Sequence, residues 1–390
     1  MAATTETRAT RWATGATVTA LIAFAFASIS AADPSFSGLG PPSGYTYSRA
    51  NGVSDNSVVA GMNYSPSTQA FRWTLADGMV PLEPGTTIAD AISADGTTIV
   101  GYTDQVACYW DSGGVTKIGD LPGGGNISHA YGISPDGSVI VGVGDAGAGK
   151  EAFRWTRATG SMEGLGSLEP GAMSFAYDVS SEGAVIVGNV ETGSGWQPCR
   201  WDSGGITGLG YLDGYTHNGT AYGVSADGQV VVGVSEGTAS SQAFRLVAGH
   251  DMEGLGHLSG DTHSTAKDTN ADGSLIVGYS NTTSGTRAFI WDETHEMRDL
   301  RDVLVSEYDL GDALTGWTLD EAHAISPNGR FIAGEGTNPS GQGEAWVVDL
   351  GEASGTDGVV PEPISMAFMG SAFVGVVAVR LRKRRKARRG

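Results

Sequence analysis

Basic residues are scarce in most of this 390-residue chain. Between residues 33 and 363 there are 13 lysines and arginines against 42 aspartates and glutamates, a net charge of −29. Such a surface repels nucleic acid and anionic lipid, and it attracts counter-ions and cationic partners. The composition therefore predicts that nucleic acid is not a partner, and that the acidic surface serves solubility or binds cations.

The chain also lacks the sequence motifs of several enzyme classes. It contains no Gly-x-Ser-x-Gly elbow, no His-Glu-x-x-His sequence and no phosphate-binding loop of the usual spacing. No pair of carboxylates is distinguished from the acidic background as a glycosidase pair. Neither of the two cysteines, Cys108 and Cys199, has the spacing of a zinc site. The sequence therefore predicts no catalytic residue, no metal site, no cofactor and a protein that is not an enzyme.

Glycine, by contrast, is abundant, and it marks seven internal repeats. One repeat reads Ala-Tyr-Gly-Ile-Ser-x-Asp-Gly-Ser-Val-Ile-Val-Gly, then a polar loop, Ala-Phe-Arg-Trp, a second loop and Met-Glu-Gly-Leu-Gly. The glycine that closes the apolar run occurs in every repeat, as Gly61, Gly101, Gly142, Gly188, Gly233, Gly278 and Gly334. The intervals of 40 to 56 residues are typical of repeat architectures such as propellers.

Each repeat holds four short segments with strand character. The second segment is continuously apolar and β-branched, which favours a strand buried on both faces. Asp-Gly or Asn-Gly separates the first two segments in most repeats and predicts a type I′ hairpin. Four antiparallel strands in this length are typical of one propeller blade. The sequence predicts an all-β fold, a seven-bladed β-propeller of four-stranded repeats over residues 33–350, with an open stack or a sandwich as the alternative.

The two ends of the repeat region predict how a ring would close. The last repeat ends with its third segment, Ala345–Val348, whereas a copy of the fourth segment, Phe36–Gly40, precedes the first repeat. We expect Phe36–Gly40 to fill the outer edge of the last blade, because a closed ring leaves no strand edge open.

Side chains that recur in the third segment predict packing. The tryptophans are expected in the core, and the repeated arginines are expected to pair with carboxylates. Cys108 and Cys199 occupy the phenylalanine position of two different repeats, so we expect two buried apolar side chains rather than a disulfide. The recurring tryptophans are Trp73, Trp110, Trp155, Trp201 and Trp291, and the recurring arginines are Arg72, Arg154, Arg200 and Arg245.

Polar loops carry the candidate binding residues, since recognition usually lies on loops that a rigid scaffold positions. His217 and His263 occupy nearly equivalent positions in adjacent repeats. They either bind a metal or a sugar with neighbouring aspartates, or they are polar loop surface. The candidate ligand contacts on the loop face are His129, Trp196, Asp213, Tyr215, His217, Asp261 and His263.

Both ends of the chain carry targeting signals. Arg8 and Arg11 precede an apolar run that ends in small residues, which predicts a signal peptide over 1–32, cleaved after Ala32 or Ser30. Residues 351–359 have the composition of a flexible linker. The last segment, 360–390, comprises the motif Val360-Pro361-Glu362-Pro363, an apolar stretch 364–379 that predicts a transmembrane helix, and a basic tail 380–389. The tail residues expected to remain cytoplasmic include Arg380, Arg382, Lys383, Arg384 and Arg385.

This C-terminal organisation resembles the PEP-CTERM sorting signal. The resemblance covers about the last 30 residues. It implies that an exosortase recognises Pro361, Glu362 and Pro363, and that the membrane helix anchors the chain until processing. The repeats resemble the HAF-type extracellular repeat, named for Ala-Phe segments such as Ala152-Phe153 and Ala243-Phe244, and Trp317–Ser326 resembles the final repeat of that family.

These features predict an exported, exosortase-sorted protein, anchored in the inner membrane before processing and then located at the cell surface or in the extracellular matrix. Its propeller would be a non-enzymatic binding or adhesion scaffold for exopolysaccharide or a surface protein. An alternative is an extracellular polysaccharide-acting enzyme, a hydrolase or a lyase. A third is cation storage or cross-linking through the acidic surface.

Overall fold

The computed structural model describes residues 33–352, except 65–66, 83–86, 148 and 283–284. The predicted signal peptide, sorting motif, transmembrane helix and basic tail, with most of the predicted linker, lie outside the described residues. Within the described part of the chain, no helix has the length and apolar character of a membrane span.

The described residues are mainly β-strands, and each repeat contributes them in the same order. The first strands are β2 (Tyr47–Val53), β6 (Thr87–Ile92), β10 (His129–Ile133), β14 (Ser174–Val179), β18 (Asn218–Val224), β22 (His263–Thr269) and β26 (Thr318–Ile325). The second strands are β3 (Val59–Tyr64), β7 (Ile99–Thr103), β11 (Val139–Asp145), β15 (Ile186–Thr192), β19 (Val230–Glu236), β23 (Leu275–Thr282) and β27 (Phe331–Thr337).

The third and fourth strands complete each repeat. The third strands are β4 (Gln69–Thr74), β8 (Val106–Asp111), β12 (Lys150–Thr156), β16 (Gly195–Asp202), β20 (Ser241–Val247), β24 (Gly285–Asp292) and β28 (Gly343–Asp349). The fourth strands are β5 (Gly78–Pro81), β9 (Gly114–Gly119), β13 (Ser161–Gly164), β17 (Gly205–Gly208), β21 (Glu253–Gly254) and β25 (Glu296–Asp299), with β1 (Ser35–Gly38) in the last sheet. One α-helix, α1 (Leu300–Ser306), and one 3₁₀ turn, η1 (Ser181–Gly183), also occur in the described residues.

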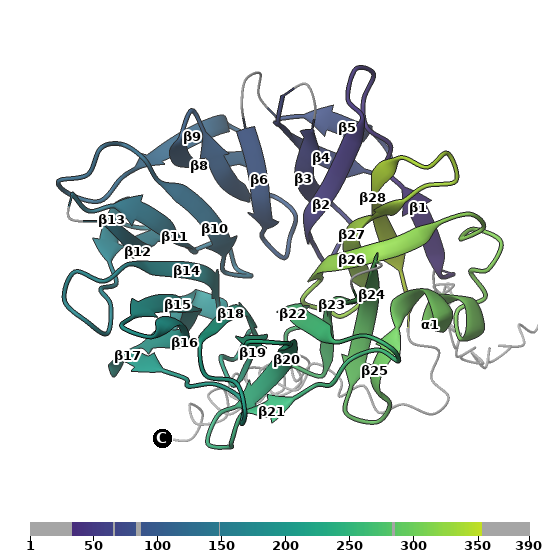
Figure 1. The fold of residues 1–390 in the computed structure, drawn as a ribbon. Coiled ribbons are helices and arrows are strands. Elements are labelled where there is room, and N and C mark those ends of the chain that lie inside the picture. The colour runs from purple at the N-terminus through teal and green to yellow at the C-terminus, as the bar shows by residue number, and fades with distance from the viewer. Residues whose placement is uncertain (1–32, 65–66, 83–86, 148, 283–284, 353–390) are drawn as a thin grey trace, which may run out of the picture. The chain divides into compact units, whose positions relative to one another are not determined.

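These strands form five four-stranded sheets and one eight-stranded sheet in the described residues. The eight-stranded sheet divides into two sets of four, because a single parallel pairing, Ser241 with His263, joins β20 to β22. Within the unit from residue 33 to 352 the sheets follow one another around a central axis, with the first strands nearest the centre (Figure 1).

The segment that precedes the first repeat completes the sheet of the last repeat, as the sequence predicts. β1 pairs antiparallel with β28 and becomes the outer strand beside β26 and β27. The ring of Phe36 on β1 packs edge-on against Trp317, with 5.0 Å between centroids. At the inner side of the same junction, the buried N–H of Ala345 donates to Ser48 Oγ on β2 at 2.9 Å. The N-terminal part of the described chain therefore meets the last repeat in two ways, by the pairing of β1 with β28 and by a hydrogen bond from β28 to β2 of the neighbouring sheet.

The Asp-Gly hairpins between first and second strands differ from the prediction. In the second repeat, Gly96 has a φ of +71°, but Asp95 is not in the left-handed region. The N–H of Gly96 donates to the carbonyl of Ser93, and Ser93 Oγ donates to the Asp95 carboxylate at 2.6 Å. This is a type I turn followed by a left-handed glycine, not a type I′ turn. The side chain of Ser93 favours this turn, because Ser93 Oγ also accepts a hydrogen bond from the N–H of Thr98.

The glycine that closes the apolar run faces a β-bulge in the first strand. In the second repeat, Gly101 pairs with Ala89, and the register shifts between Ala89 and Ala91. A Cβ atom on Gly101 would lie 1.9 Å from the carbonyl oxygen of Ile88, and the six equivalent glycines would meet a carbonyl at 1.9 to 2.1 Å. Only glycine therefore fits opposite this bulge. The bulged residues, named here the bulge ring, are Asn51, Asp90, Tyr131, Tyr177, Tyr222, Lys267 and His323.

The third strands confirm most of the predicted packing. The five repeated tryptophans are buried, and Cys108 on β8 and Cys199 on β16 are buried in separate sheets. Burial raises the pKa of the Cys199 thiol. Three of the repeated arginines lie within ion-pair distance of a carboxylate: Arg72 of Asp77, Arg200 of Asp202 and Arg245 of Glu253. Arg154 instead donates to the carbonyl of Gly183 at 3.1 Å.

Replacing Phe36 with alanine should lower the free energy of unfolding by about 2 kcal/mol, because the lost ring packs between the last sheet and Trp317. Urea unfolding of the full-length chain measures this. The control is Leu75→Ala, since Leu75 is 80% exposed and should be nearly neutral. Equal, small effects of both changes would contradict the role of β1 in closure.

Candidate functional site

The bulge ring takes one half-buried residue from every first strand, and these strands lie nearest the centre of the unit (Figure 1). Three tyrosines follow one another on β10, β14 and β18. The ring centroids of Tyr131 and Tyr177 are 5.2 Å apart, and those of Tyr177 and Tyr222 are 5.4 Å apart. The Lys267 Nζ atom lies 3.9 Å from the centroid of Tyr222. The site thus contains a row of aromatic rings that ends in a cation.

The remaining bulged residues continue this network. His129 Nε2 lies 2.6 Å from the Asp90 carboxylate, and the His129 ring is 4.2 Å from those of Tyr102 and Tyr131. Arg49 donates to the Asn51 side chain at 2.7 Å. The Asn51 amide in turn donates to the carbonyl of Ala89 at 2.8 Å, on the neighbouring sheet. Polar contacts therefore link successive sheets around the centre.

Burial shifts the pKa values of several groups at the centre. Burial lowers the pKa of Lys267 to about 8 and that of His323 to about 4. Burial also raises the pKa of Tyr222 to about 12. The pKa of Glu321 is raised by burial and by the nearby charge of Glu335. At neutral pH these shifts leave His323 neutral and keep the proton on Tyr222.

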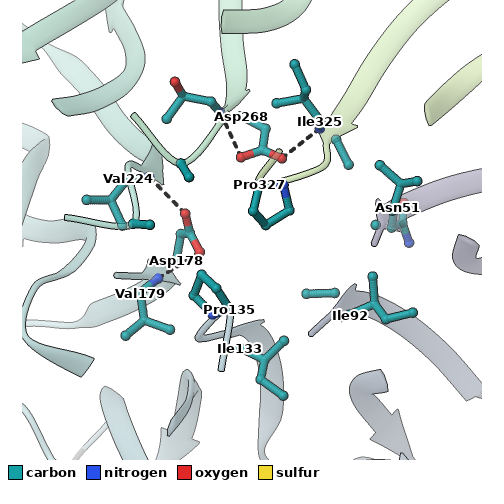
Figure 2. Close-up of a pocket in the computed structure, with 17 residues that line it drawn as sticks. Asn51, Ile92, Ile133, Pro135, Asp178, Val179, Val224, Asp268, Ile325 and Pro327 are labelled. Carbon is teal, nitrogen blue, oxygen red and sulfur yellow. Dashed lines mark hydrogen bonds between the residues drawn. The ribbon is translucent and has the colours of Figure 1, made fainter. Parts of the chain in front are cut away.

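A cavity of about 100 Å³, the axial pocket, adjoins Asn51 of the bulge ring. Figure 2 shows Asp178 and Asp268 with their carboxyl groups directed into it. Asp178 accepts the N–H groups of Val179 at 2.7 Å and Val224 at 2.8 Å. Each aspartate bridges its own strand to the first strand of the next sheet, since Asp268 accepts the N–H of Ile325 at 2.9 Å in the same way.

The two aspartates influence each other's ionisation. Burial raises the pKa of Asp178 to about 7. Burial and the charge of Asp178 raise the pKa of Asp268 well above its ordinary value. The pair therefore carries less than its full negative charge at neutral pH. The sequence does not single out this pair, because its two residues are 90 positions apart in the chain.

The predicted loop contacts are brought to this site only in part. His129 belongs to the central network, whereas Trp196 packs on Phe175 at 5.4 Å and Asp261 pairs with Arg287 at 2.9 Å. His217 and His263 each contact the threonine that precedes them, Thr216 and Thr262. Within the described residues no hydrogen bond or ion pair joins these two histidines. Tyr215 accepts a hydrogen bond from Ser240, and Asp213 is exposed.

No family model matches the chain, and a search of curated proteins finds no match. Among solved structures it is similar to oligogalacturonate lyase from Vibrio parahaemolyticus, at 12% identity and a TM-score of 0.54 over 82% of this chain and 97% of that one. An oligogalacturonate lyase in complex with manganese matches at 12% identity and 0.55, over 83% and 96%.

A third similar structure is the β-propeller domain of the Trilobed protease from Pyrococcus furiosus, described as having an open velcro topology. It has 9% identity and a TM-score of 0.52 over 78% of this chain and 95% of that one. At such identities the likeness shows the fold alone. The described residues form a β-propeller.

The prediction that the protein is not an enzyme is wrong. It rested on the lack of local catalytic motifs, but two of the structures that share this fold are oligogalacturonate lyases. A ring of repeats assembles its central side chains from distant positions, so the lack of a local motif does not exclude an active site.

The double variant Asp178→Asn, Asp268→Asn should change how stability depends on pH. A carboxyl with a raised pKa stays protonated in the folded state while the unfolded chain ionises above pH 4. Wild-type stability should therefore fall, relative to the variant, between about pH 4 and 7, by up to about 1.4 kcal/mol per pH unit for each group. Thermal unfolding of both chains across this range measures the difference.

A control with the opposite sign is Asp95→Asn. Burial raises the pKa of Asp95, but hydrogen bonds from Ser93 and Thr97 outweigh this effect and lower the pKa below its ordinary value. The wild type should therefore gain stability relative to this variant as the pH rises towards 4. Parallel curves for the wild type and the double variant would contradict the raised pKa values of the axial pair.

Proposed function

We propose that this chain is an exported enzyme that cleaves an acidic extracellular polysaccharide by β-elimination at the bulge ring of a seven-bladed propeller. The blade number treats the eight-stranded sheet as two blades, which the single pairing between β20 and β22 supports. A lyase is one of the two enzyme classes, hydrolase and lyase, that the sequence offers as an alternative to a non-enzymatic scaffold.

The observation that carries the proposal is the position of Lys267 above Tyr222, at the end of the tyrosine row. Only 13 basic residues occur between 33 and 363, and two of them, Arg49 and Lys267, belong to the central network. Arg49 can bind a carboxylate, and tyrosines present an apolar face together with a hydroxyl group. This combination suits a polymer of sugar acids.

The residues also suit the chemistry of elimination. A base removes the proton from the ring carbon that bears the carboxylate, and the electron pair forms a double bond to the next ring carbon. The glycosidic C–O bond at that next carbon breaks, and its oxygen takes a proton. Lys267, with its pKa lowered to about 8, can act as the base near neutral pH, and Tyr222 can supply the proton. Arg49 can bind the carboxylate.

Structural neighbours support the substrate class without identifying the substrate. Two of them are named for a lyase reaction on oligogalacturonate. Oligogalacturonate is a polymer of a sugar acid, in agreement with the cations and tyrosines at the centre of this chain.

Incubation of the full-length chain with polygalacturonate, or with exopolysaccharide from its host, should release products with the ultraviolet absorbance of an unsaturated uronate. Lys267→Met should lower the rate by about 100-fold or more, since it removes the base. The control Lys117→Met replaces a surface lysine that pairs with Asp104 and should leave the rate unchanged. Reducing ends without the absorbance, or an active Lys267→Met variant, would overturn the proposed reaction.

We propose in addition that an exosortase processes this chain at its C-terminus. The order of Val360-Pro361-Glu362-Pro363, the apolar stretch and the basic tail supports the proposal. The chain would be held in the inner membrane before processing and reach the cell surface or the extracellular matrix afterwards.

In the native host, the variant Pro361→Ala, Glu362→Gln should accumulate in the membrane fraction with its tail attached, because the motif is no longer recognised. Fractionation followed by mass spectrometry of the C-terminus measures this. Glu352→Gln, upstream of the motif, is the control and should be processed normally. Normal processing of the motif variant would exclude recognition by these residues.

A further inference from the structure

Three metal-ligating side chains meet beside the bulge ring. Glu321 and His323 lie on β26, and Glu335 lies on β27 directly opposite Glu321 in the antiparallel register. His323 is the bulged residue of its strand, so its imidazole lies beside this carboxylate pair. One ligand atom from each of the three side chains lies within 4.8 Å of the other two.

The Nε2 atom of His323 is buried between two carboxylates and lacks a hydrogen-bond partner of normal length. Its side chain is only 8% exposed, and its Nε2 atom has no hydrogen-bond partner among the described residues. Nε2 lies 3.6 Å from Glu321 Oε2 and 3.8 Å from Glu335 Oε1, and both distances are too long for a hydrogen bond. A buried polar atom directed at two carboxylates without bonding to either is costly, unless something between them binds all three.

We propose that Glu321, His323 and Glu335 bind a divalent first-row transition metal ion, such as Zn²⁺ or Mn²⁺. An imidazole nitrogen with two carboxylate oxygens is a donor set that these ions accept. Ligand atoms at tetrahedral angles around zinc lie about 3.4 Å apart, because each is about 2.1 Å from the ion. The 3.6 and 3.8 Å separations from Nε2 are close to this value, so these two pairs need only a small inward movement. Three protein ligands leave a coordination position for water or a substrate oxygen.

The surroundings of the three residues support a cation there. Tyr47 donates its hydroxyl hydrogen to the Glu335 carboxylate, which fixes the orientation of that group. Arg49 is engaged with Asn51, and Lys267 lies over Tyr222. Within the described residues no arginine or lysine forms an ion pair with Glu321 or Glu335. Arg49 and Lys267 are near enough to oppose the rise that burial causes in the pKa of Glu321, but neither contacts the two carboxylates directly. The inference rests on these positions and holds whether or not the chain is a lyase.

The test is a calorimetric titration of the chelator-treated, full-length chain with ZnCl₂ and, separately, with MnCl₂. Elemental analysis after dialysis then gives the number of ions bound per chain. One ion should bind per chain. His323→Ala and Glu335→Gln should weaken binding at least 10-fold, and Tyr47→Phe by about 10-fold. The control is His295→Ala, because His295 forms a similar pair with Asp292 but its side chain is 57% exposed.

Pulsed electron paramagnetic resonance of the Mn²⁺ complex provides a second readout on the unaltered chain, since a histidine nitrogen bound to Mn²⁺ gives a measurable coupling. Nitrogen coupling, together with loss of affinity in the two ligand variants, would support the site. The proposal is overturned if neither ion binds saturably. It is also overturned if His323→Ala binds like the wild type, which would place the ions on the acidic surface.

Discussion

The structure depends on the close approach between a carbonyl group of each first strand and a glycine of the second. The carbonyl fills the space where any other residue would carry its Cβ atom, which would lie about 2 Å from the carbonyl oxygen in every repeat. This contact accompanies a bulge, which removes the residue after the repeated alanine from the regular pairing in each repeat. Because the first strands are innermost (Figure 1), all seven bulged residues belong to the strands that surround the centre. The same glycine that identifies the repeats in the sequence therefore also creates the central group of polar side chains.

Much of the architecture could be predicted, because it is repeated. The four strands per repeat, the buried tryptophans and the pairing of β1 with β28 all follow from patterns that recur along the chain. The hairpin type could not be predicted from Asp-Gly alone. Its conformation depends on the serine two residues before the aspartate, whose side chain bonds both to the turn and to the next strand.

The candidate site was largely missed for a physical reason. The position after the repeated alanine holds asparagine, aspartate, tyrosine, lysine or histidine, so it carries no recurring signal of function. Simple alternation along a strand gives no indication of a bulge, which changes the direction of the side chains that follow it. Of the residues chosen from the loops, only His129 reaches the central network, because it directly precedes a repeated alanine. Glu321 and His323 lay within a recognised repeat, but Glu335 meets them only through the pairing of β26 with β27.

The bulge has a consequence for how such a protein can change over evolutionary time. The close approach of the two strands restricts the residue types at the alanine and the glycine. The bulged residue itself has no partner in the ladder. Seven positions at the centre of the molecule can therefore be substituted one at a time, while the residues that maintain the fold stay the same. Duplication of a repeat would add one more such position to the axis. A lineage built on this unit could acquire new central chemistry through single substitutions, without rebuilding the scaffold that holds them.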